Sequence, residues 1–426
     1  MTPIEDHPLR YRLANELHAR PFPTLQAPCT AVFLAIKQPV NAVGRDRDQD
    51  LAHLVSLLDR HGVAHPQPGA THYSGQIGRH VLKWEQHTEF VTYTVFTPGL
   101  SARAFDPTDF EVFPEDWLAQ APGLRVTSAL IRIEERPAKQ VLDACLGEWF
   151  VPESLAVSEV LDDAAVIATD FRINPDGHMR MAAFVSPGTG ERRVGRIVQR
   201  LCEIETYKSM SMLGFARVRA LDGPIGEVEK RLNHLMAQIT RGDTAPEVTL
   251  DALLQSSAEL ENMIAESSFR FGATSAYEAI VDQRVSVMRE RRYNGRQSFA
   301  DFMMRRYDPA MRTVASTKKR MEALAHRAMR AGEMLRTKVD VSRSAQNQAL
   351  LKSMDRRADL ALRLQETVEG LSVVAISYYA VSLASYAAYP AAQALEISKG
   401  QLTAMLTLPV VLVVWWLVRR IRSRMH

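Results

Sequence analysis

Two apolar stretches near the C-terminus decide the fold: Leu371-Ser-Val-Val-Ala-Ile-Ser-Tyr-Tyr-Ala-Val-Ser-Leu-Ala-Ser-Tyr-Ala-Ala-Tyr389 and Leu402-Thr-Ala-Met-Leu-Thr-Leu-Pro-Val-Val-Leu-Val-Val-Trp-Trp-Leu-Val418. Neither contains a charged residue, and each approaches the roughly 20 residues that cross a hydrocarbon core as a helix. The alternative is a buried helical hairpin of a soluble protein, but soluble cores rarely hold two such helices side by side. We therefore expect transmembrane helices at 371–389 and 402–418, joined by an outer loop at 390–401.

The charges that flank these stretches predict their orientation. Four basic residues precede the first stretch, and the tail 419–426 carries four arginines after the second. The loop between the stretches offers only Lys399 against Glu396. Because cytoplasmic flanks carry an excess of Lys and Arg, we expect both termini in the cytoplasm. The first residues lack the apolar core of a signal peptide, so insertion is expected to depend on the two spans, with membrane lipid as a partner.

Composition excludes several classes of protein. The chain has 426 residues and a formal net charge of only +3. Acidic and basic residues are interspersed, so no nucleic-acid partner is expected. Cys29, Cys145 and Cys202 lie far apart and form no CxxC motif. Disulfides and a structural zinc site are therefore not expected, which agrees with a reducing compartment.

Upstream of the spans the apolar pattern predicts three successive parts, followed by a long stalk. Residues 1–28 form a polar, proline-rich arm. Residues 29–186 contain short apolar runs and hairpin signals at Gln86-His87-Thr88 and Asn174-Pro175-Asp176-Gly177, which are typical of a mixed α/β cytoplasmic domain. Residues 187–310 are predicted to form a helical bundle, with a break at Asp222-Gly223-Pro224 and separate helices at 245–268 and 273–292. The fold class is thus an α+β domain, a long helical stalk and a two-helix transmembrane hairpin.

The stalk, 311–370, is predicted to be one helix that continues into the first span, on the order of 120 Å long in total at 1.5 Å per residue. Lys338 and Ser342 interrupt its apolar stripe. A seam of small residues is weak as a dimeric coiled coil but suits several helices around one axis. We therefore expect a homo-oligomer. The apolar positions of the stripe are Leu324, Ala328, Ala331, Leu335, Ala349, Met354, Ala361, Leu364, Val368 and Leu371.

One face of the first span carries hydroxyl groups at intervals of seven, three, four and three residues, which share one side of a helix. One interpretation is a pore lining, because polar rings can replace part of the hydration shell of an ion. The other is hydrogen bonding between helices, which polar side chains commonly provide in membranes. A proton relay is disfavoured because the span contains no Asp, Glu, Lys or Arg. The stripe consists of Ser372, Tyr379, Ser382, Tyr386 and Tyr389.

A dense polar segment near the N-terminus, Asn15-Glu16-Leu17-His18-Ala19-Arg20-Pro21, is a second candidate site. In one interpretation it is an arm that contacts an anion or a metal, and in the other a strap held by hydrogen bonds. The side chains concerned are Asn15, Glu16, His18 and Arg20.

Other polar groups have simpler interpretations. His61 and His65 are close in sequence, but the Gly and Pro beside them favour a loop over a metal site. No nucleophile elbow, phosphate loop or dinucleotide fingerprint is present, so no cofactor is expected and an anchored enzyme is the least favoured hypothesis. Turn chemistry is expected for Asp170, Arg172, Asp176 and His178, and surface or interhelix ion pairs for Glu203, Glu205, Tyr207 and Lys208.

Several segments resemble a bacterial family of membrane-anchored proteins of unknown function, over essentially the whole chain. That resemblance implies a bacterial inner-membrane protein but no activity. The segments are His7-Pro8-Leu9-Arg10, Asn15-Glu16-Leu17-His18-Ala19-Arg20-Pro21, Leu201-Cys-Glu-Ile-Glu-Thr-Tyr207, Arg270-Phe-Gly-Ala-Thr-Ser-Ala-Tyr277 and Thr367-Val-Glu-Gly-Leu-Ser-Val-Val-Ala-Ile-Ser-Tyr-Tyr379.

The order of domain, helices, stalk and two spans also resembles the CorA-type magnesium channels. This resemblance implies a pentamer whose first span lines a pore. The Gly-Met-Asn signature of those channels is absent, because Tyr386-Ala387-Ala388-Tyr389-Pro390 stands at that end of the span. Two hypotheses follow: a CorA-like oligomer that acts as a divergent ion channel or transporter, and a non-conducting anchored scaffold or sensor whose α/β domain binds a ligand or partner.

Overall fold

The computed structural model describes residues 4–11, 13–14, 22–39, 44–241, 244–394 and 398–425. The chain divides into two compact units, Met1–Asp243 with Asp251–Ala331 and Thr244–Leu250 with Gly332–His426. The elements are, in order, β1 (Cys29–Lys37), α2 (Arg47–Arg60), β2 (His72–Ile77), β3 (His80–Gln86), β4 (Phe90–Pro98), η1 (Pro107–Val112), α3 (Glu115–Leu118), β5 (Leu124–Glu135), α4 (Lys139–Trp149), β6 (Ala156–Val160), β7 (Ala165–Ile173), β8 (Met179–Val185), α5 (Glu191–Arg241), α6 (Pro246–Ser286), β9 (Arg291–Arg292), α7 (Phe299–Phe302), η2 (Met303–Tyr307), α8 (Asp308–Ala394) and α9 (Lys399–Met425).

The first unit is built on a nine-stranded sheet with the order β2-β3-β4-β1-β5-β8-β7-β6-β9. The strands pair antiparallel except β5 and β8, which run parallel. The predicted hairpin at 174–177 is confirmed, since Gly177 N donates to Asn174 O at 2.9 Å between β7 and β8. The hairpin predicted around 86–88 is confirmed as well, since β3 and β4 pair antiparallel. The α+β class expected for the N-terminal domain is therefore correct.

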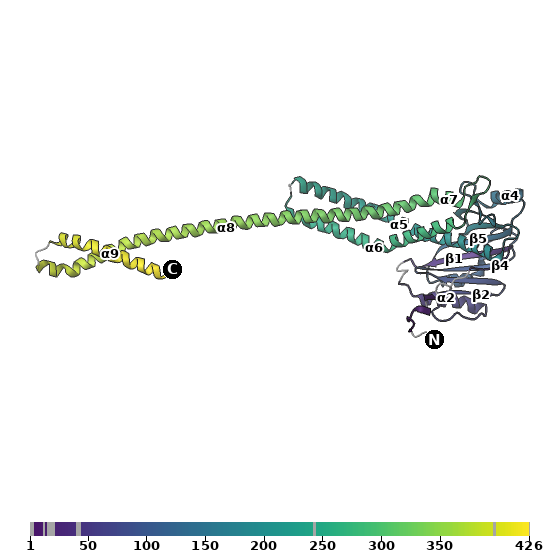
Figure 1. Cartoon of the computed structure of the whole chain (residues 1–426), viewed down its shortest axis with the longest axis horizontal. Helices are drawn as coiled ribbons and strands as arrows, with labels where there is room; N and C mark the ends of the chain where they lie inside the picture. The colour runs from purple at the N-terminus through teal and green to yellow at the C-terminus, as the bar shows by residue number, and fades with distance from the viewer. Residues whose placement is uncertain are drawn as a thin grey trace. The chain divides into compact units, whose positions relative to one another are not determined.

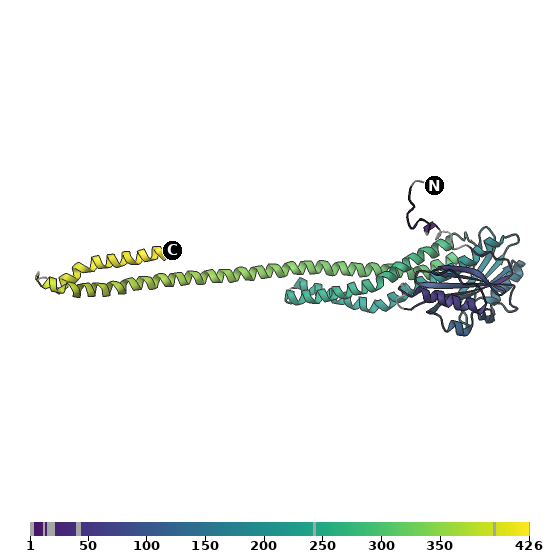
Figure 2. The ribbon, with the colours of Figure 1, turned by 90° about the horizontal axis from the view of Figure 1, so that it is seen from below.

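Helices cover both faces of this sheet (Figures 1 and 2). Strand alternation sends Val32 and Leu34 of β1 into a core with α2, α3 and α4, where Trp117 is fully buried. The intervening Ala31 and Phe33 pack on the opposite face against the first turns of α5. Two-sided burial explains why β1 is apolar throughout, as strands covered on both faces generally are.

Helix α5 is continuous where the sequence predicted a break at Asp222-Gly223-Pro224. Its apolar positions keep a helical spacing through the proline and pack against α6 and the beginning of α8. This burial outweighs the roughly 3 kcal/mol that an interior proline costs a helix. Helix α6 is likewise one helix, whereas the sequence predicted separate helices at 245–268 and 273–292. The positions that hold α5 in the bundle are Val218, Leu221, Ile225, Val228 and Leu232.

The apolar stripe of α8 has two different environments. Leu324, Ala328 and Ala331 are buried against α5 and α6 within the first unit. In the second unit Leu335 is still buried, but the positions from Ala349 to Leu371 are exposed. The sequence pattern predicted one continuous seam. In the structure its first part is buried against other helices of the same chain, and its second part is exposed.

In the second unit the end of α8 and helix α9 form a hairpin, and they lie side by side in both views (Figures 1 and 2). The helices extend beyond the predicted spans, to Ala394 and from Lys399, so the predicted loop 390–401 is largely helical. Pro390 lies inside α8, which membrane helices tolerate. Ser398 begins α9 as a capping box, because Gln401 Oε1 accepts from Ser398 N at 3.1 Å and Ser398 Oγ from Gln401 N at 3.4 Å.

Both helices of this hairpin contain a segment that is long and apolar enough to cross a membrane. The two segments are 11% and 0% buried, whereas a core helix of a soluble protein is mostly buried. The described part of the chain thus has two candidate membrane-spanning helices.

Candidate ligand-binding pocket

The sheet face beneath α5 is polar where β3 and β4 form it. Lys83 and Glu85 of β3 and Thr92 and Thr94 of β4 point to this face, while the intervening side chains enter the opposite core. Lys83, Thr92 and Thr94 are only 5–7% exposed. Buried polar groups cost free energy unless they gain partners. Packing alone therefore does not account for this face.

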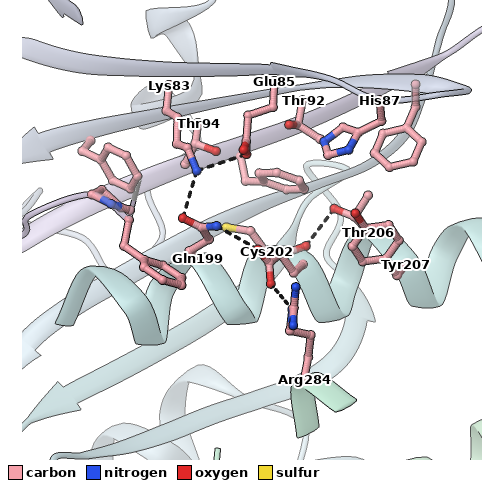
Figure 3. Close-up of a pocket in the computed structure, with 16 residues that line it drawn as sticks. Lys83, Glu85, His87, Thr92, Thr94, Gln199, Cys202, Thr206, Tyr207 and Arg284 are labelled. Atoms are coloured by element: carbon pink, nitrogen blue, oxygen red, sulfur yellow. Dashed lines mark hydrogen bonds and ion pairs between the residues drawn. The ribbon is translucent and has the colours of Figure 1, made fainter. Parts of the chain in front are cut away.

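A cavity of about 260 Å³ separates the polar face from α5 (Figure 3). Charged and hydroxyl groups occupy its middle, and aromatic rings from the sheet stand beside them. Its walls are Phe22, Pro23, Phe33, Lys83, Glu85, His87, Phe90, Thr92, Thr94, Phe96, Gln199, Cys202, Glu203, Thr206, Tyr207 and Arg284.

A chain of hydrogen bonds and ion pairs crosses this pocket from β3 to α6 (Figure 3). Lys83 Nζ lies 3.1 Å from Glu85 Oε2 and donates to Gln199 Oε1 at 2.9 Å. Gln199 Nε2 donates to Glu203 Oε1 at 2.8 Å, and Glu203 pairs with Arg284 of α6. The interhelix ion pair expected for Glu203 is therefore confirmed. Its role at the wall of a pocket was not predicted.

The hydroxyls and the thiol of the pocket differ in what they can do. The Thr92 and Thr94 hydroxyls make no hydrogen bond with any residue that the structure describes, so they are available to a ligand. Thr206 Oγ1 donates to Cys202 O at 2.7 Å and keeps its lone pairs. Burial raises the pKa of the Cys202 thiol well above its usual value, so the sulfur stays protonated. A thiolate nucleophile is not available here, and the groups present suit binding better than covalent catalysis.

A buried carboxylate supports one end of the pocket. Glu89 is fully buried and forms an ion pair with Arg270, and Tyr277 Oη donates to it at 2.7 Å. Lys37 Nζ lies 3.9 Å away. Burial, and then the hydrogen bond to Glu89, raise the pKa of Tyr277, which remains a neutral donor. Its ring lies 5.4 Å from that of Tyr207, so this cluster positions an aromatic wall of the pocket.

The peptide before β1 closes another side of the pocket. Phe22 and Pro23 line the cavity, and the Arg196 guanidinium lies 5.5 Å from the Phe22 ring centre. Leu25 N donates to Glu191 O at 3.2 Å. A Cβ on Gly195 would lie 1.7 Å from Pro23 O, so only glycine allows this approach. The segment 22–25 is thus a strap that packs on the first turns of α5.

Gly195→Ala should displace the strap without unfolding the sheet. The added methyl group cannot share the space of the Pro23 carbonyl, so we expect faster proteolytic cleavage near residues 22–25 and a lower melting temperature. Gly223→Ala is the matched control, because a Cβ there meets nothing within 4 Å, and alanine favours the helix by up to about 1 kcal/mol. Equal cleavage rates in the two variants would contradict this role of Gly195.

The structure does not bring the sequence-predicted site residues to this pocket. Asn15, Glu16, His18 and Arg20 lie outside the described residues. The hydroxyl stripe belongs to the other unit, where Tyr379 and Tyr386 are about 70% exposed. Instead, the buried face of α8 in that hairpin carries Ser377, Val381 and Ser385. The pore-lining role of Ser372, Tyr379, Ser382, Tyr386 and Tyr389 therefore stays a prediction.

The remaining polar groups occupy structural positions. His65 Nε2 lies 2.6 Å from Asp59 Oδ1. Asn174 Oδ1 accepts from His178 N at 2.8 Å, which is the turn chemistry expected there. Among the residues that the structure describes, no group of three His, Cys, Asp or Glu side chains could hold a metal ion.

These features define a class: an α+β domain with a small polar pocket, long helices and two candidate membrane-spanning helices. The chain belongs to a family described as a protein of unknown function, DUF3422, whose model matches residues 5–425. No curated protein and no solved structure matches it. Two segments that carried the resemblance, Leu201–Tyr207 and Arg270–Tyr277, meet at the pocket, the first in its wall and the second through Glu89.

Proposed function

We propose that this protein is a membrane-anchored sensor whose α+β domain binds a small molecule in the pocket beneath α5. The observation that carries the proposal is the buried polar face of β3 and β4, with two free hydroxyls, opposite a hydrogen-bonded helix wall. Concave sites with a few converging polar groups are the usual form of small-molecule sites. The α8–α9 hairpin is the proposed anchor in a bacterial inner membrane, and the basic flanks support cytoplasmic termini.

The same groups offer a way to transmit binding. Gln199 and Glu203 belong to α5, and Arg284 belongs to α6. A ligand that takes over the hydrogen bonds of Gln199 would change the charge pairing between the two helices. Both helices also pack against the beginning of α8. Ligand binding would therefore alter the bundle through α5 and α6, because packed helices shift between discrete arrangements.

The test is a binding screen on the full chain in detergent. We expect at least one small polar metabolite to raise the melting temperature, since a ligand that binds only the folded state stabilises it. Gly195→Ala should weaken that effect, and Gly223→Ala should preserve it. If no compound of any class shifts the melting temperature or remains bound in native mass spectrometry, the sensor proposal fails.

A CorA-like homo-oligomer, with a pentamer implied by resemblance, is the second candidate, and the exposed stripe of α8 favours it. Met354, Ala361, Leu364, Val368 and Leu371 are exposed and follow at seven, three, four and three residues. This heptad spacing suits parallel helices from several copies. Assembly of this kind would give the exposed hydroxyl stripe a protein neighbour.

Native mass measurement and ion flux separate these possibilities. We expect more than one chain in each particle, and a monomeric mass would contradict the homo-oligomer proposal. If the spans conduct, purified protein in liposomes should carry a cation flux that Tyr379→Leu or Ser382→Leu reduces. Intact oligomers without flux for any common cation would contradict the channel hypothesis and favour a non-conducting sensor.

A further inference from the structure

We infer that the pocket takes a small zwitterion with an apolar side chain, of the size of a single amino acid. The inference rests on the proposed binding function and adds the chemical class of the ligand. Its basis is the arrangement of charges, hydroxyls and rings around Gln199.

The charges that line the pocket balance. Lys83 and Arg284 face the carboxylates of Glu85 and Glu203, and the two pairs stand on opposite walls. A ligand with a single charge would favour one member of each pair and oppose the other in a largely buried site. A ligand with both charges can compensate one group of each pair. Net neutrality together with separated charges therefore selects a dipolar ligand.

Gln199 already has the contact pattern that such a ligand would make. Its amide oxygen accepts from Lys83 Nζ at 2.9 Å, and its amide nitrogen donates to Glu203 Oε1 at 2.8 Å. The side chain is thus a neutral dipole that joins a cation on the sheet to a carboxylate on the helix. A ligand carboxylate at Lys83 and an ammonium group at Glu203 would replace these two bonds, each of which has one charged partner, with two in which both partners are charged.

The remaining walls suit the rest of an amino acid. The free hydroxyls of Thr92 and Thr94 lie on the sheet face beside Lys83 and can donate to the carboxylate. Phe33, Phe90 and Phe96 offer an apolar surface to the side chain. A cavity of about 260 Å³ is below the roughly 300–1,000 Å³ of sites for drug-sized ligands. Nucleotides and dinucleotide cofactors are therefore too large.

The experiment measures binding of L-leucine to the full chain in detergent by calorimetry, beside two capped analogues. N-acetyl-L-leucine lacks the positive charge, and L-leucinamide lacks the negative one. We expect L-leucine to bind, and each analogue to bind at least about tenfold more weakly, because each loses one charge-assisted hydrogen bond. L-alanine and L-phenylalanine test the size of the apolar part.

Two variants assign each charge to its partner. In Lys83→Met, L-leucinamide should bind about as tightly as L-leucine, because the cation that pairs with the ligand carboxylate is gone. In Glu203→Gln, N-acetyl-L-leucine should bind about as tightly as L-leucine, because the carboxylate that pairs with the ligand ammonium group is gone. Each comparison is a ratio of the dissociation constants of two ligands for the same variant, so a modest loss of stability does not affect it. Lys139→Met, at an exposed position of α4, should leave both ratios unchanged.

The outcomes separate this inference from the proposed function. If the capped analogues bind as tightly as L-leucine, the zwitterion inference is overturned while a binding pocket remains. If no amino acid binds but another class of metabolite stabilises the protein, the inference is wrong and the sensor proposal stands. If nothing of any class binds, both are wrong.

Discussion

Glu89→Ala should lower the free energy of unfolding by about 3–5 kcal/mol, because it removes a buried carboxylate that pairs with Arg270 and Lys37. Glu89 is fully buried, and its partner Lys37 is 7% exposed. Arg270 and the Tyr277 hydroxyl would lose their shared acceptor, and water could reach them only in part. An unpaired buried cation costs more than the pair contributes, so the penalty exceeds that of any surface ion pair.

Equilibrium denaturation of the full chain in detergent measures this effect. The matched control is Glu266→Ala, which removes an exposed carboxylate that pairs with Arg217 at 2.9 Å. Its side chain is 68% exposed, so we expect a loss of no more than about 1 kcal/mol. Glu89→Gln keeps a hydrogen-bond acceptor and should fall between the two. Similar losses for Glu89→Ala and Glu266→Ala would show that the cluster is not the support of the pocket.

Strand patterns predicted the hairpins of the first unit, but not the pocket. Lys83 and Glu85 alternate with Leu82 and Trp84, which is the pattern of a strand with one face in water. The pattern does not distinguish water from a helix that covers a polar cavity. Arg284 enters the same site from far along the chain, and no spacing rule connects it to β3. The cover of the sheet by α5 could only be seen in the structure.

Helix ends were predicted less well than helix content. The apolar stripe of α5 already ran through Pro224, and the cost of one proline was overestimated against the burial on both sides of it. At α9 a local signal was present: Ser398 and Gln401 have the spacing of a capping box, which places the helix start before Leu402. In the stalk, by contrast, periodicity could not separate the buried positions from the exposed ones, because both have the same residue types.

Leu412→Arg should prevent α9 from crossing the membrane. Leu412 is 58% exposed in the middle of an uncharged stretch, and an arginine at the centre of a span costs about 2.5–3.5 kcal/mol on insertion scales. With α8 inserted and α9 excluded, the C-terminus would move to the opposite side of the membrane. A reporter fused after the last residue should therefore change from cytoplasmic in the unaltered chain to largely external in the variant.

Ile421→Arg is the control, because the same charge is added beside the basic end of α9. Arg419 and Arg420 lie 5.1 and 5.0 Å from the ring centres of Trp415 and Trp416, an arrangement typical of a membrane boundary. An added arginine there stays in the polar layer, so the reporter should remain cytoplasmic. If Leu412→Arg behaves like Ile421→Arg, α9 does not lie in hydrocarbon and the anchoring proposal is wrong. A difference between the two variants would depend on depth alone, since their added charge is the same.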